Sequence, residues 1–471
     1  MQINGESVNS ENNEFIEVTN PATNEVIAKV PNGNKTEAIK AVDAAYAAYK
    51  DWSAKTAGER SQLLMKWFQL IEENKEELAI TMTKEQGKPY KEALGEINYA
   101  NSFISWYAEE GKRVYGETIP SSHRNKRLLV QKQPVGVIAA ITPWNFPAAM
   151  ITRKVAPALA VGCTAVVKPA TQTPLTAIRL VELAHEAGIP KGVLNVVTGN
   201  SKAIGDAWLQ DSRVRKLTFT GSTEVGKHLM KGAADTVKKI SLELGGHAPF
   251  IVMEDADLNK AVEGVIASKF RNAGQTCICT NRIYVHESIE AEFNEKFSEA
   301  VKQLKVANGL EEGTDVGPLI DQNAIDKVKE HIEDAVGKGG TILLGGKKAD
   351  ISNGYYFEPT IISNVTDDML CMSEETFGPL APVSTFKTEE EVIERANHTN
   401  YGLAAYVFTE NLGKAIRISE KLEYGIIGLN DGLPSVAQAP FGGIKESGLG
   451  REGGHYGMDE YLEVKYVSIG F

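Results

Sequence analysis

Apolar residues recur at three- and four-residue spacing through the first part of the chain, as in helices that bury one face. The pattern is clear over 38–52 and 60–73, and it predicts mostly helical structure over 36–110. A short apolar run with a polar end follows at 127–133, and we interpret it as a strand.

From about residue 135, short apolar runs alternate with helical patterns. The predicted strands of this series are 135–141, 164–167, 193–197, 216–220 and 239–244. Helices are predicted after Pro147 and near Pro174, Ser201 and Thr223. Strands that alternate with helices are typical of parallel βαβ units, which bind ligands at the carboxyl ends of their strands.

A second alternating series occupies 249–430. Its predicted strands are 250–253, 283–286, 382–386, 404–408 and 426–429. The two series predict two α/β domains. The last strand-like segment, 461–469, could extend another sheet, including one in a partner subunit.

Residues 134–151 are uncharged over 18 positions, near the length of a membrane span. Pro134, Pro143 and Pro147 would break a helix in lipid, so the segment predicts a strand, a loop and the start of a helix. The N-terminal residues lack a basic region followed by an apolar core, and we expect a cytoplasmic protein with no membrane association.

Charge and cysteine content exclude other classes. Asp plus Glu number 62 against 50 Lys plus Arg, a formal net charge of -12, so a nucleic-acid-coating role is not expected. Four cysteines in 471 residues argue against a disulfide scaffold. Hydrophobic residues make up 42%, as in ordinary globular proteins.

Cys277 lies in the segment F-R-N-A-G-Q-T-C-I-C, residues 270–279. A cysteine in such a segment is a candidate nucleophile if its thiolate is stabilised, although a small buried packing role is commoner for a lone cysteine. Cys279 is two residues away, but no second cysteine pair stands at zinc spacing, so we expect no metal site.

Three further segments carry candidate chemistry. Glu243 stands among apolar residues in L-E-L-G-G, where burial would raise its pKa and suit a general base, unless it is a surface salt-bridge residue. Asn145 in T-P-W-N-F-P could donate to an oxyanion or stabilise a turn. The turn F-T-G-S-T-E-V-G, 219–226, suits close approach of a pyrophosphate or nicotinamide.

Together these motifs resemble the aldehyde dehydrogenase superfamily. The other matching segments are E-E-T-F-G-P at 374–379, P-F-G-G at 440–443 and N-P-A-T at 20–23. The resemblance implies an α/β fold with a Rossmann-like nucleotide-binding domain, an α/β catalytic domain and a small β oligomerisation extension. The implied boundaries are 1–118 with 136–246, then 247–440, and finally 119–135 with 455–471. A homodimer or homotetramer is implied.

The resemblance also implies a mechanism. The Cys277 thiolate attacks the aldehyde, and the Asn145 side chain and the Cys277 backbone N–H hold the oxyanion, at roughly 3 kcal/mol per donor. A hydride passes to the nicotinamide, and Glu243 activates the water that hydrolyses the remaining thioester. The implied cofactor contacts are Thr142, Pro143, Trp144, Asn145, Lys168, Thr171, Gly221, Ser222, Gly226, Glu375 and Phe377.

Within the superfamily, Arg153, Arg271 and Ser435 are similar to the pattern of the succinate-semialdehyde dehydrogenases, as are C-I-C at 277–279 and S-G-L-G-R-E-G at 447–453. Two guanidiniums would bind the distal carboxylate of a small semialdehyde, unless they pair with local acids. Glutarate semialdehyde stays open as an alternative, because one methylene is worth only about 1–3 kcal/mol in a pocket.

Thr171 stands where NAD-preferring relatives often carry a glutamate that would repel a 2′-phosphate. We therefore expect NADP to be accepted and preferred over NAD. The C-x-C pair also predicts a reversible Cys277–Cys279 disulfide under oxidants, with packing of Cys279 as the alternative.

Three other functions fit the sequence less well. A non-catalytic structural role is disfavoured by the intact Cys277, Glu243 and Asn145. A CoA-acylating dehydrogenase would need no water-activating glutamate, and a broad aldehyde oxidiser would not need Arg153 and Arg271.

Overall fold

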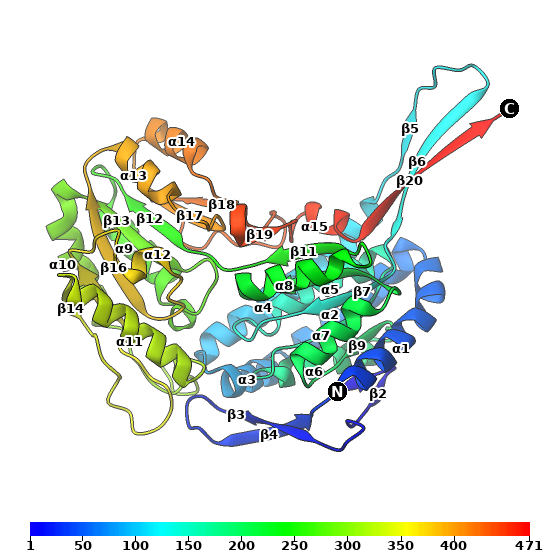
Figure 1. Ribbon diagram of the computed structural model, residues 1–471, viewed down its shortest axis with the longest axis horizontal. Helices are drawn as coiled ribbons and strands as arrows, with labels where there is room; N and C mark the ends of the chain where they lie inside the picture. The colour runs from blue at the N-terminus through cyan, green and yellow to red at the C-terminus, as the bar shows by residue number, and fades with distance from the viewer.

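The computed structural model describes residues 1–471, and it consists of two α/β units and a projecting arm. Figure 1 shows the two units side by side, with the arm extending from the first of them and carrying the C-terminus at its tip. The first unit contains an eight-stranded sheet and the second a seven-stranded sheet, whereas the arm is a three-stranded sheet.

The sheet of the first unit has the strand order β19-β11-β10-β7-β8-β9-β1-β2. Its strands are β1 Gln2–Ile3, β2 Glu6–Ser7, β7 Val137–Ile141, β8 Thr164–Lys168, β9 Leu194–Val196, β10 Val214–Thr220, β11 Lys239–Glu243 and β19 Gly448–Leu449. The five central strands, β11 to β9, are parallel, as the alternating sequence pattern predicts.

Helices cover both faces of this sheet, which explains why its strands are continuous apolar runs. In β7, the side chains of Val137 and Ala139 lie on one face of the sheet, and those of Ile138 and Ala140 lie on the other. The first face is covered by α1 Lys35–Ala54, α7 Ser201–Gln210 and α8 Thr223–Ala234. The second is covered by α2 Ala57–Glu73, α3 Lys75–Gln86, α4 Tyr90–Glu110, α5 Ala149–Val161 and α6 Pro174–Glu186.

The second unit repeats the design with the strand order β14-β15-β16-β13-β12-β17-β18. Its strands are β12 Ala248–Val252, β13 Thr280–His286, β14 Thr341–Leu344, β15 Thr360–Ser363, β16 Leu380–Phe386, β17 Ala404–Phe408 and β18 Ile426–Leu429. Its helices are α9 Leu258–Lys269, α10 Glu290–Val301, α11 Gln322–Gly337, α12 Leu370–Ser373, α13 Glu389–Asn397 and α14 Leu412–Lys421.

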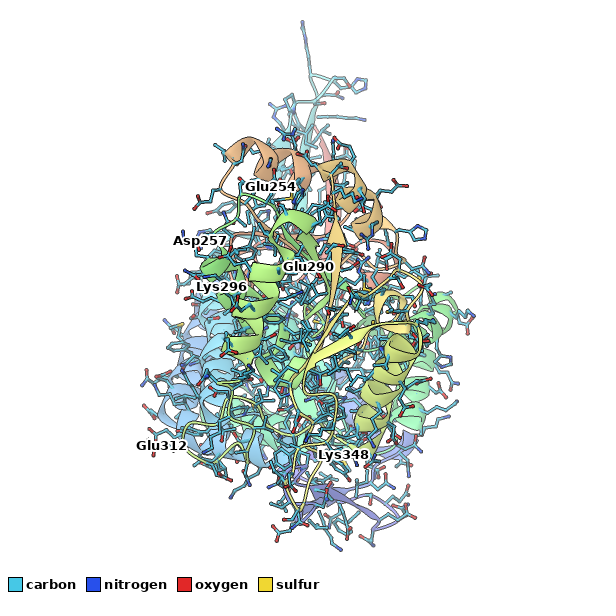
Figure 2. All side chains as sticks on the ribbon, turned by 90° about the vertical axis from the view of Figure 1, so that its left-hand side faces the viewer. Glu254, Asp257, Glu290, Lys296, Glu312 and Lys348 are labelled. Carbon is cyan, nitrogen blue, oxygen red and sulfur yellow. The ribbon has the colours of Figure 1, made fainter.

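The helices of the second unit are amphipathic, and α10 is a clear example. It buries Phe293 and Phe297 in the core, whereas Glu290 and Lys296 lie on its outer side (Figure 2). This charged outer surface is an ordinary solvated helix face.

The arm consists of β5 Glu117–Ile119, β6 Lys126–Pro134 and β20 Leu462–Gly470. The last strand pairs with β6 in antiparallel register from Leu462 opposite Pro134 to Gly470 opposite Lys126. The other edge of β20 has no partner strand. The side chains of Val464 and Tyr466 in β20 are exposed. α15 Tyr456–Asp459 leads into this strand.

The sequence pattern missed four longer strands. β3 Phe15–Thr19 and β4 Val26–Pro31 form a separate hairpin in which Glu17 and Lys29 interrupt the apolar residues, so neither strand has a continuous apolar run. β14 is mostly exposed, and β15 has only four residues, so neither gives a strong signal. The uncharged segment 134–151 is strand, loop and helix start, as predicted, and no helix combines the length and apolar character that crossing a membrane requires.

The position of β7 determines where a ligand can bind to the first unit. The chain proceeds from β7 to β8 and β9 on one side, and then returns to form β10 and β11 on the other. The carboxyl ends of β7 and β10 therefore flank the topological switch point, where open α/β sheets bind ligands. The segments that follow these two ends are 142–147 and 221–226, both of which carry predicted site residues.

Candidate active site

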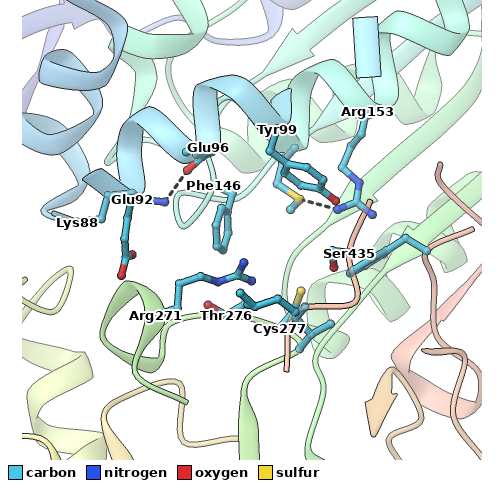
Figure 3. A pocket seen from close by; sticks show the side chains of 15 residues that line it. Lys88, Glu92, Glu96, Tyr99, Phe146, Arg153, Arg271, Thr276, Cys277 and Ser435 are labelled. Carbon is cyan, nitrogen blue, oxygen red and sulfur yellow. Dashed lines mark hydrogen bonds and ion pairs between the residues drawn. The ribbon is translucent and has the colours of Figure 1, made fainter. Parts of the chain in front are cut away.

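Two cavities meet at Cys277, whose side chain lines both. The arginine cavity, of about 330 Å³, is lined by cationic and aromatic residues together with Thr276 and Ser435 (Figure 3). The glycine cavity, of about 240 Å³, is lined by Pro143, Trp144, Asn145, Gly221, Ser222, Gly245, Glu375 and Phe377, among others. A group bound in one cavity can therefore reach the same sulfur as a group bound in the other.

Asn145 lies on the loop after β7 and is tied to the cysteine segment. Its Nδ2 donates to the backbone carbonyl of Gln275 at 3.1 Å, and its Oδ1 is buried without a partner. One N–H of the amide is thus committed to the segment that leads to Cys277, and the second is available to an oxyanion.

The Cys277 thiol lies in surroundings that disfavour the thiolate. Burial raises its pKa to about 12, and the carboxyls of Glu375 and Glu243 add to the rise, whereas Arg153 and Arg271 oppose it. The resting group is therefore a protonated thiol at neutral pH. A nucleophilic reaction needs a base that removes this proton.

Glu243 is the last residue of β11, and its side chain is buried. Burial raises the pKa of its carboxyl well above the ordinary value, and the negative charge of Glu452 raises it further. Its Oε2 has no hydrogen-bond partner, and it lines neither cavity. A Cβ at Gly442 would lie 2.8 Å from its Oε1, so the glycine of the P-F-G-G segment leaves room for the carboxylate.

The glycines of the L-E-L-G-G segment permit two close approaches. A Cβ at Gly246 would lie 2.2 Å from the backbone oxygen of Cys277, and one at Gly245 would lie 2.9 Å from a carboxylate oxygen of Glu375. Glu375 in turn accepts a hydrogen bond from the Gly246 N–H at 3.1 Å, and burial raises its pKa to about 7.

An aromatic pair closes the glycine cavity. The rings of Trp144 and Phe377 meet edge to face, with centroids 5.5 Å apart. Phe377 has a φ of 54°, in the left-handed region that is costly for a bulky residue. The loop after α12 thus holds this ring against the loop after β7 despite the backbone strain.

Four predicted cofactor residues lie outside the lining of the glycine cavity: Thr142, Lys168, Thr171 and Gly226. Thr142 follows β7 and Lys168 is the last residue of the neighbouring strand β8, and the Thr142 N–H donates to the Lys168 carbonyl at 3.0 Å. Gly226 is inside α8, where a Cβ would lie 2.4 Å from Leu244, so it serves close packing of helix on strand.

Lys168 is buried without a carboxylate partner. Its Nζ donates only to the Pro169 carbonyl, at 2.7 Å, and burial lowers its pKa to about 8. The hydroxyls of Thr142 and Thr220, at the ends of β7 and β10, are buried and unpartnered as well. Unsatisfied donors at the switch point fit a polyhydroxyl, phosphate-bearing ligand such as a dinucleotide.

The two predicted substrate arginines differ in their surroundings. Arg153, on α5, forms a buried ion pair with Glu452 and lies over the Phe441 ring at 4.0 Å. Arg271 forms no ion pair, its Nε is unpartnered, and its guanidinium points into the arginine cavity (Figure 3). The Ser435 hydroxyl in the same lining is buried and unpartnered. Pairing with a local acid, the alternative considered for both arginines, thus applies to Arg153 alone.

Sequence reasoning missed several residues of the site. Lys88, Glu92 and Glu96 from the helical region also line the arginine cavity, and Lys88 forms a buried ion pair with Glu96. Glu452 pairs with both Arg153 and Lys154; burial alone would raise its pKa, but these two cations hold it below the ordinary value. No local signal marks these carboxylates, because their partners lie far away in the sequence.

Cys279, two residues after Cys277, is buried and lines neither cavity. Its sulfur is 3.3 Å from Lys269 Nζ, and all four cysteines are free thiols. Burial raises the pKa of the Cys279 thiol.

Comparisons with known proteins show which family the chain resembles. A sequence profile of the Aldehyde dehydrogenase family matches residues 7–467. The chain is 58% identical to a glutarate-semialdehyde dehydrogenase of Pseudomonas putida, covering 99% of this chain and 97% of the relative. It is 56% identical to an NADP(+) succinate-semialdehyde dehydrogenase of Escherichia coli, covering 99% and 97%. The solved structure of a succinate-semialdehyde dehydrogenase from Burkholderia pseudomallei matches with a TM-score of 0.99 at 53% identity, covering 100% and 97%.

Proposed function

The chain belongs to the aldehyde dehydrogenase family, and we propose that it oxidises succinate semialdehyde to succinate with NADP as the preferred hydride acceptor. One observation carries the proposal. Cys277 lines both the arginine cavity, which contains the unpaired Arg271, and the glycine cavity, which lies at the topological switch point of the first sheet.

Cys277 is the proposed nucleophile. The Cys277 thiol loses its proton to water, and the sulfur adds to the aldehyde carbon to give a thiohemiacetal. The Asn145 amide and the Cys277 N–H hold the oxygen, which carries the developing charge. Loss of hydride from carbon leaves a thioester on Cys277.

Glu243 is the proposed base for the second half of the reaction. Its carboxylate removes a proton from water as the water attacks the thioester, and the Cys277 thiol is regenerated as succinate leaves. The raised pKa of Glu243 makes it a stronger base than an ordinary carboxylate, which suits this step.

The glycine cavity and the switch point are the proposed cofactor site. NADP, when bound, supplies the hydride acceptor. Glu375 and Phe377 would contact its nicotinamide ribose and ring, and Lys168 and Thr171 its adenine ribose, where Thr171 lacks the carboxylate of a glutamate that would repel a 2′-phosphate. The name of the E. coli relative supports NADP over NAD.

The arginine cavity is the proposed substrate site. Arg271 and Ser435 have unpartnered donors there, and a carboxylate at the far end of a short semialdehyde would satisfy them. Arg153 adds positive charge beside them. Glutarate semialdehyde is the second candidate substrate, favoured by the identity with the P. putida relative.

We further propose that two or four copies assemble through the arm. The free edge of β20 on the arm and the edge strand β18 of the second unit are two of the strand edges available for pairing between copies. The first unit, 1–118 with 136–246, would hold the cofactor, and 247–440 would supply the nucleophile. Four free cysteines, one of them a nucleophile, suit a reducing compartment such as the cytoplasm.

A steady-state panel tests the proposal. The purified protein is assayed by NAD(P)H absorbance with succinate semialdehyde, glutarate semialdehyde, butanal and benzaldehyde, each with NADP and NAD. We expect the highest kcat/KM for succinate semialdehyde with NADP. A higher value for glutarate semialdehyde would establish the second candidate, and equal values for butanal would contradict a carboxylate-binding site. Turnover that requires CoA, or no turnover at all, would favour the acylating or non-catalytic alternative.

A further inference from the structure

Asn272 occupies the centre of a buried hydrogen-bond network between the two units. Its Nδ2 donates to the backbone carbonyls of Asn145, at 3.1 Å, and Gln275, at 3.0 Å. Its Oδ1 accepts from Gln86 Nε2 at 2.9 Å, and its backbone N–H donates to Glu92 at 2.8 Å. The side-chain amide of Asn272 is therefore fully hydrogen-bonded, once within its own segment, to Gln275, and twice to the first unit, to Asn145 and Gln86.

The backbone of this segment is held in an unfavourable conformation. Asn272 and Ala273 have φ values of 51° and 54°, so two successive residues other than glycine are left-handed. Asparagine tolerates this region better than most residues, but alanine does not. Strain of this kind persists only where the surrounding contacts over-determine the local structure.

Asn272 and the proposed oxyanion donor share an acceptor. The carbonyl of Gln275 accepts from Nδ2 of both Asn145 and Asn272. The Asn145 carbonyl also accepts from Lys88 Nζ at 2.7 Å. The backbone carbonyl of Asn145 is thus held by Asn272 and Lys88. The side-chain amide of Asn145 is held by the Gln275 carbonyl, which Asn272 also contacts.

We propose that Asn272 is a positioning residue that fixes the Asn145 amide relative to the Cys277 N–H, so that both donors of the oxyanion hole converge on one point. It contacts no substrate, since it lines neither cavity. The inference rests on the proposed function, because it assigns Asn272 a part in stabilising the oxyanion.

The test compares Asn272→Gly with Ala273→Gly. Glycine adopts the left-handed conformation readily, so Asn272→Gly removes the amide and keeps the loop geometry accessible. Ala273→Gly relieves the same kind of strain and leaves the amide bonds intact. Asn272→Asp is a second variant of nearly the same size, in which an oxygen faces the two carbonyls in place of Nδ2.

Single-turnover hydride transfer is the first readout. We expect Asn272→Gly to lower its rate by about 10- to 100-fold, somewhat less than the loss of a whole oxyanion donor. Asn272→Asp should lower it at least as much, and Ala273→Gly should leave it unchanged. Cys277 alkylation by iodoacetamide should be unaffected in all three, because the thiol itself is not perturbed. Equal losses in Ala273→Gly, or an unaltered rate in both Asn272 variants, would overturn the inference.

A double-mutant cycle separates positioning from general structural support. In an Asn145→Ala background, Asn272→Gly should cause no further loss of hydride transfer, and an additive loss would overturn the inference. If Asn145→Ala alone leaves the rate unchanged, the proposed role of Asn145 fails. The crystal structure of Asn272→Gly then decides: a broken Asn145–Gln275 bond supports positioning, and a retained bond contradicts it.

Discussion

Arg153 forms an ion pair with Glu452 in which both side chains are almost fully buried. Arg271, in the same cavity, has no such partner. The two arginines therefore differ in what their loss would do, although both add positive charge near Cys277. Removing Arg153 also takes one of its two cations, Arg153 and Lys154, from the buried Glu452 carboxylate, whereas removing Arg271 breaks no ion pair.

Arg271→Ala should raise KM for succinate semialdehyde far more than KM for butanal. A charge-assisted contact typically contributes about 1.5–3 kcal/mol, or roughly 10- to 150-fold in affinity. Arg153→Ala should do the same and also lower the melting temperature, because the buried Glu452 carboxylate then keeps only Lys154 as an ion-pair partner; the cost should be less than the about 3–5 kcal/mol of a fully broken buried pair. Thermal unfolding and paired kinetics measure both effects. Equal kinetic losses on both aldehydes would make the arginines structural.

Cys277→Ala should abolish oxidation, whereas Cys279→Ala should retain substantial activity. Glu243→Gln should allow the thioester to form and then stall, because no base activates the water. Stopped-flow absorbance would record a burst of NADPH followed by a slow phase. Full steady turnover of Glu243→Gln would exclude it as the base.

Steady-state turnover should rise with pH. The pKa of Glu243 is raised, so its carboxyl is protonated, and inactive as a base, until the pH exceeds that raised value. The Cys277 thiol also ionises more readily at high pH, but iodoacetamide alkylation reports that group separately. In Glu243→Gln the slow phase should lose the pH dependence due to this carboxyl. An unaltered pH profile of deacylation in that variant would contradict the assignment.

Cofactor preference should respond to Thr171 and Lys168. Thr171→Glu should shift kcat/KM from NADP toward NAD, because a carboxylate accepts from the 2′-OH and repels the 2′-phosphate. The pKa of Lys168 is lowered to about 8, so its charge, and with it the advantage of NADP, should decline as the pH rises above that value. An unchanged cofactor ratio in Thr171→Glu would place this residue away from the ribose.

Peroxide should inactivate the enzyme reversibly through a Cys277–Cys279 disulfide. The Cys279 sulfur must leave its contact with Lys269 to form that bond, and the very small ring makes the disulfide easy to reduce. Dithiothreitol should restore wild type but not peroxide-treated Cys279→Ala, whose lone sulfenate over-oxidises. Identical recovery of both proteins, or no intramolecular bridge by mass spectrometry, would leave Cys279 a packing residue.

Much of the fold could be predicted from the alternation of apolar runs and helical patterns. The strands of both main sheets that are buried on both faces, such as 164–168 and 404–408, gave continuous apolar runs. The more exposed strands β3 and β14 give no such strong signal. Their backbone groups pair with a neighbouring strand, and this pairing does not require their side chains to be buried. Strand order is likewise absent from the local pattern.

The sequence by itself determined the motifs around Cys277, Glu243 and Asn145, since each motif places its residue at a strand end or a glycine-rich turn that local chemistry requires. Only the tertiary structure decided which partners these residues have. The Arg153–Glu452 pair and the Asn272–Asn145 bond join positions 299 and 127 residues apart. Such contacts form only when the helices and loops of both units pack together. The resulting burial is also the main cause of the shifted pKa values of Cys277 and Glu243.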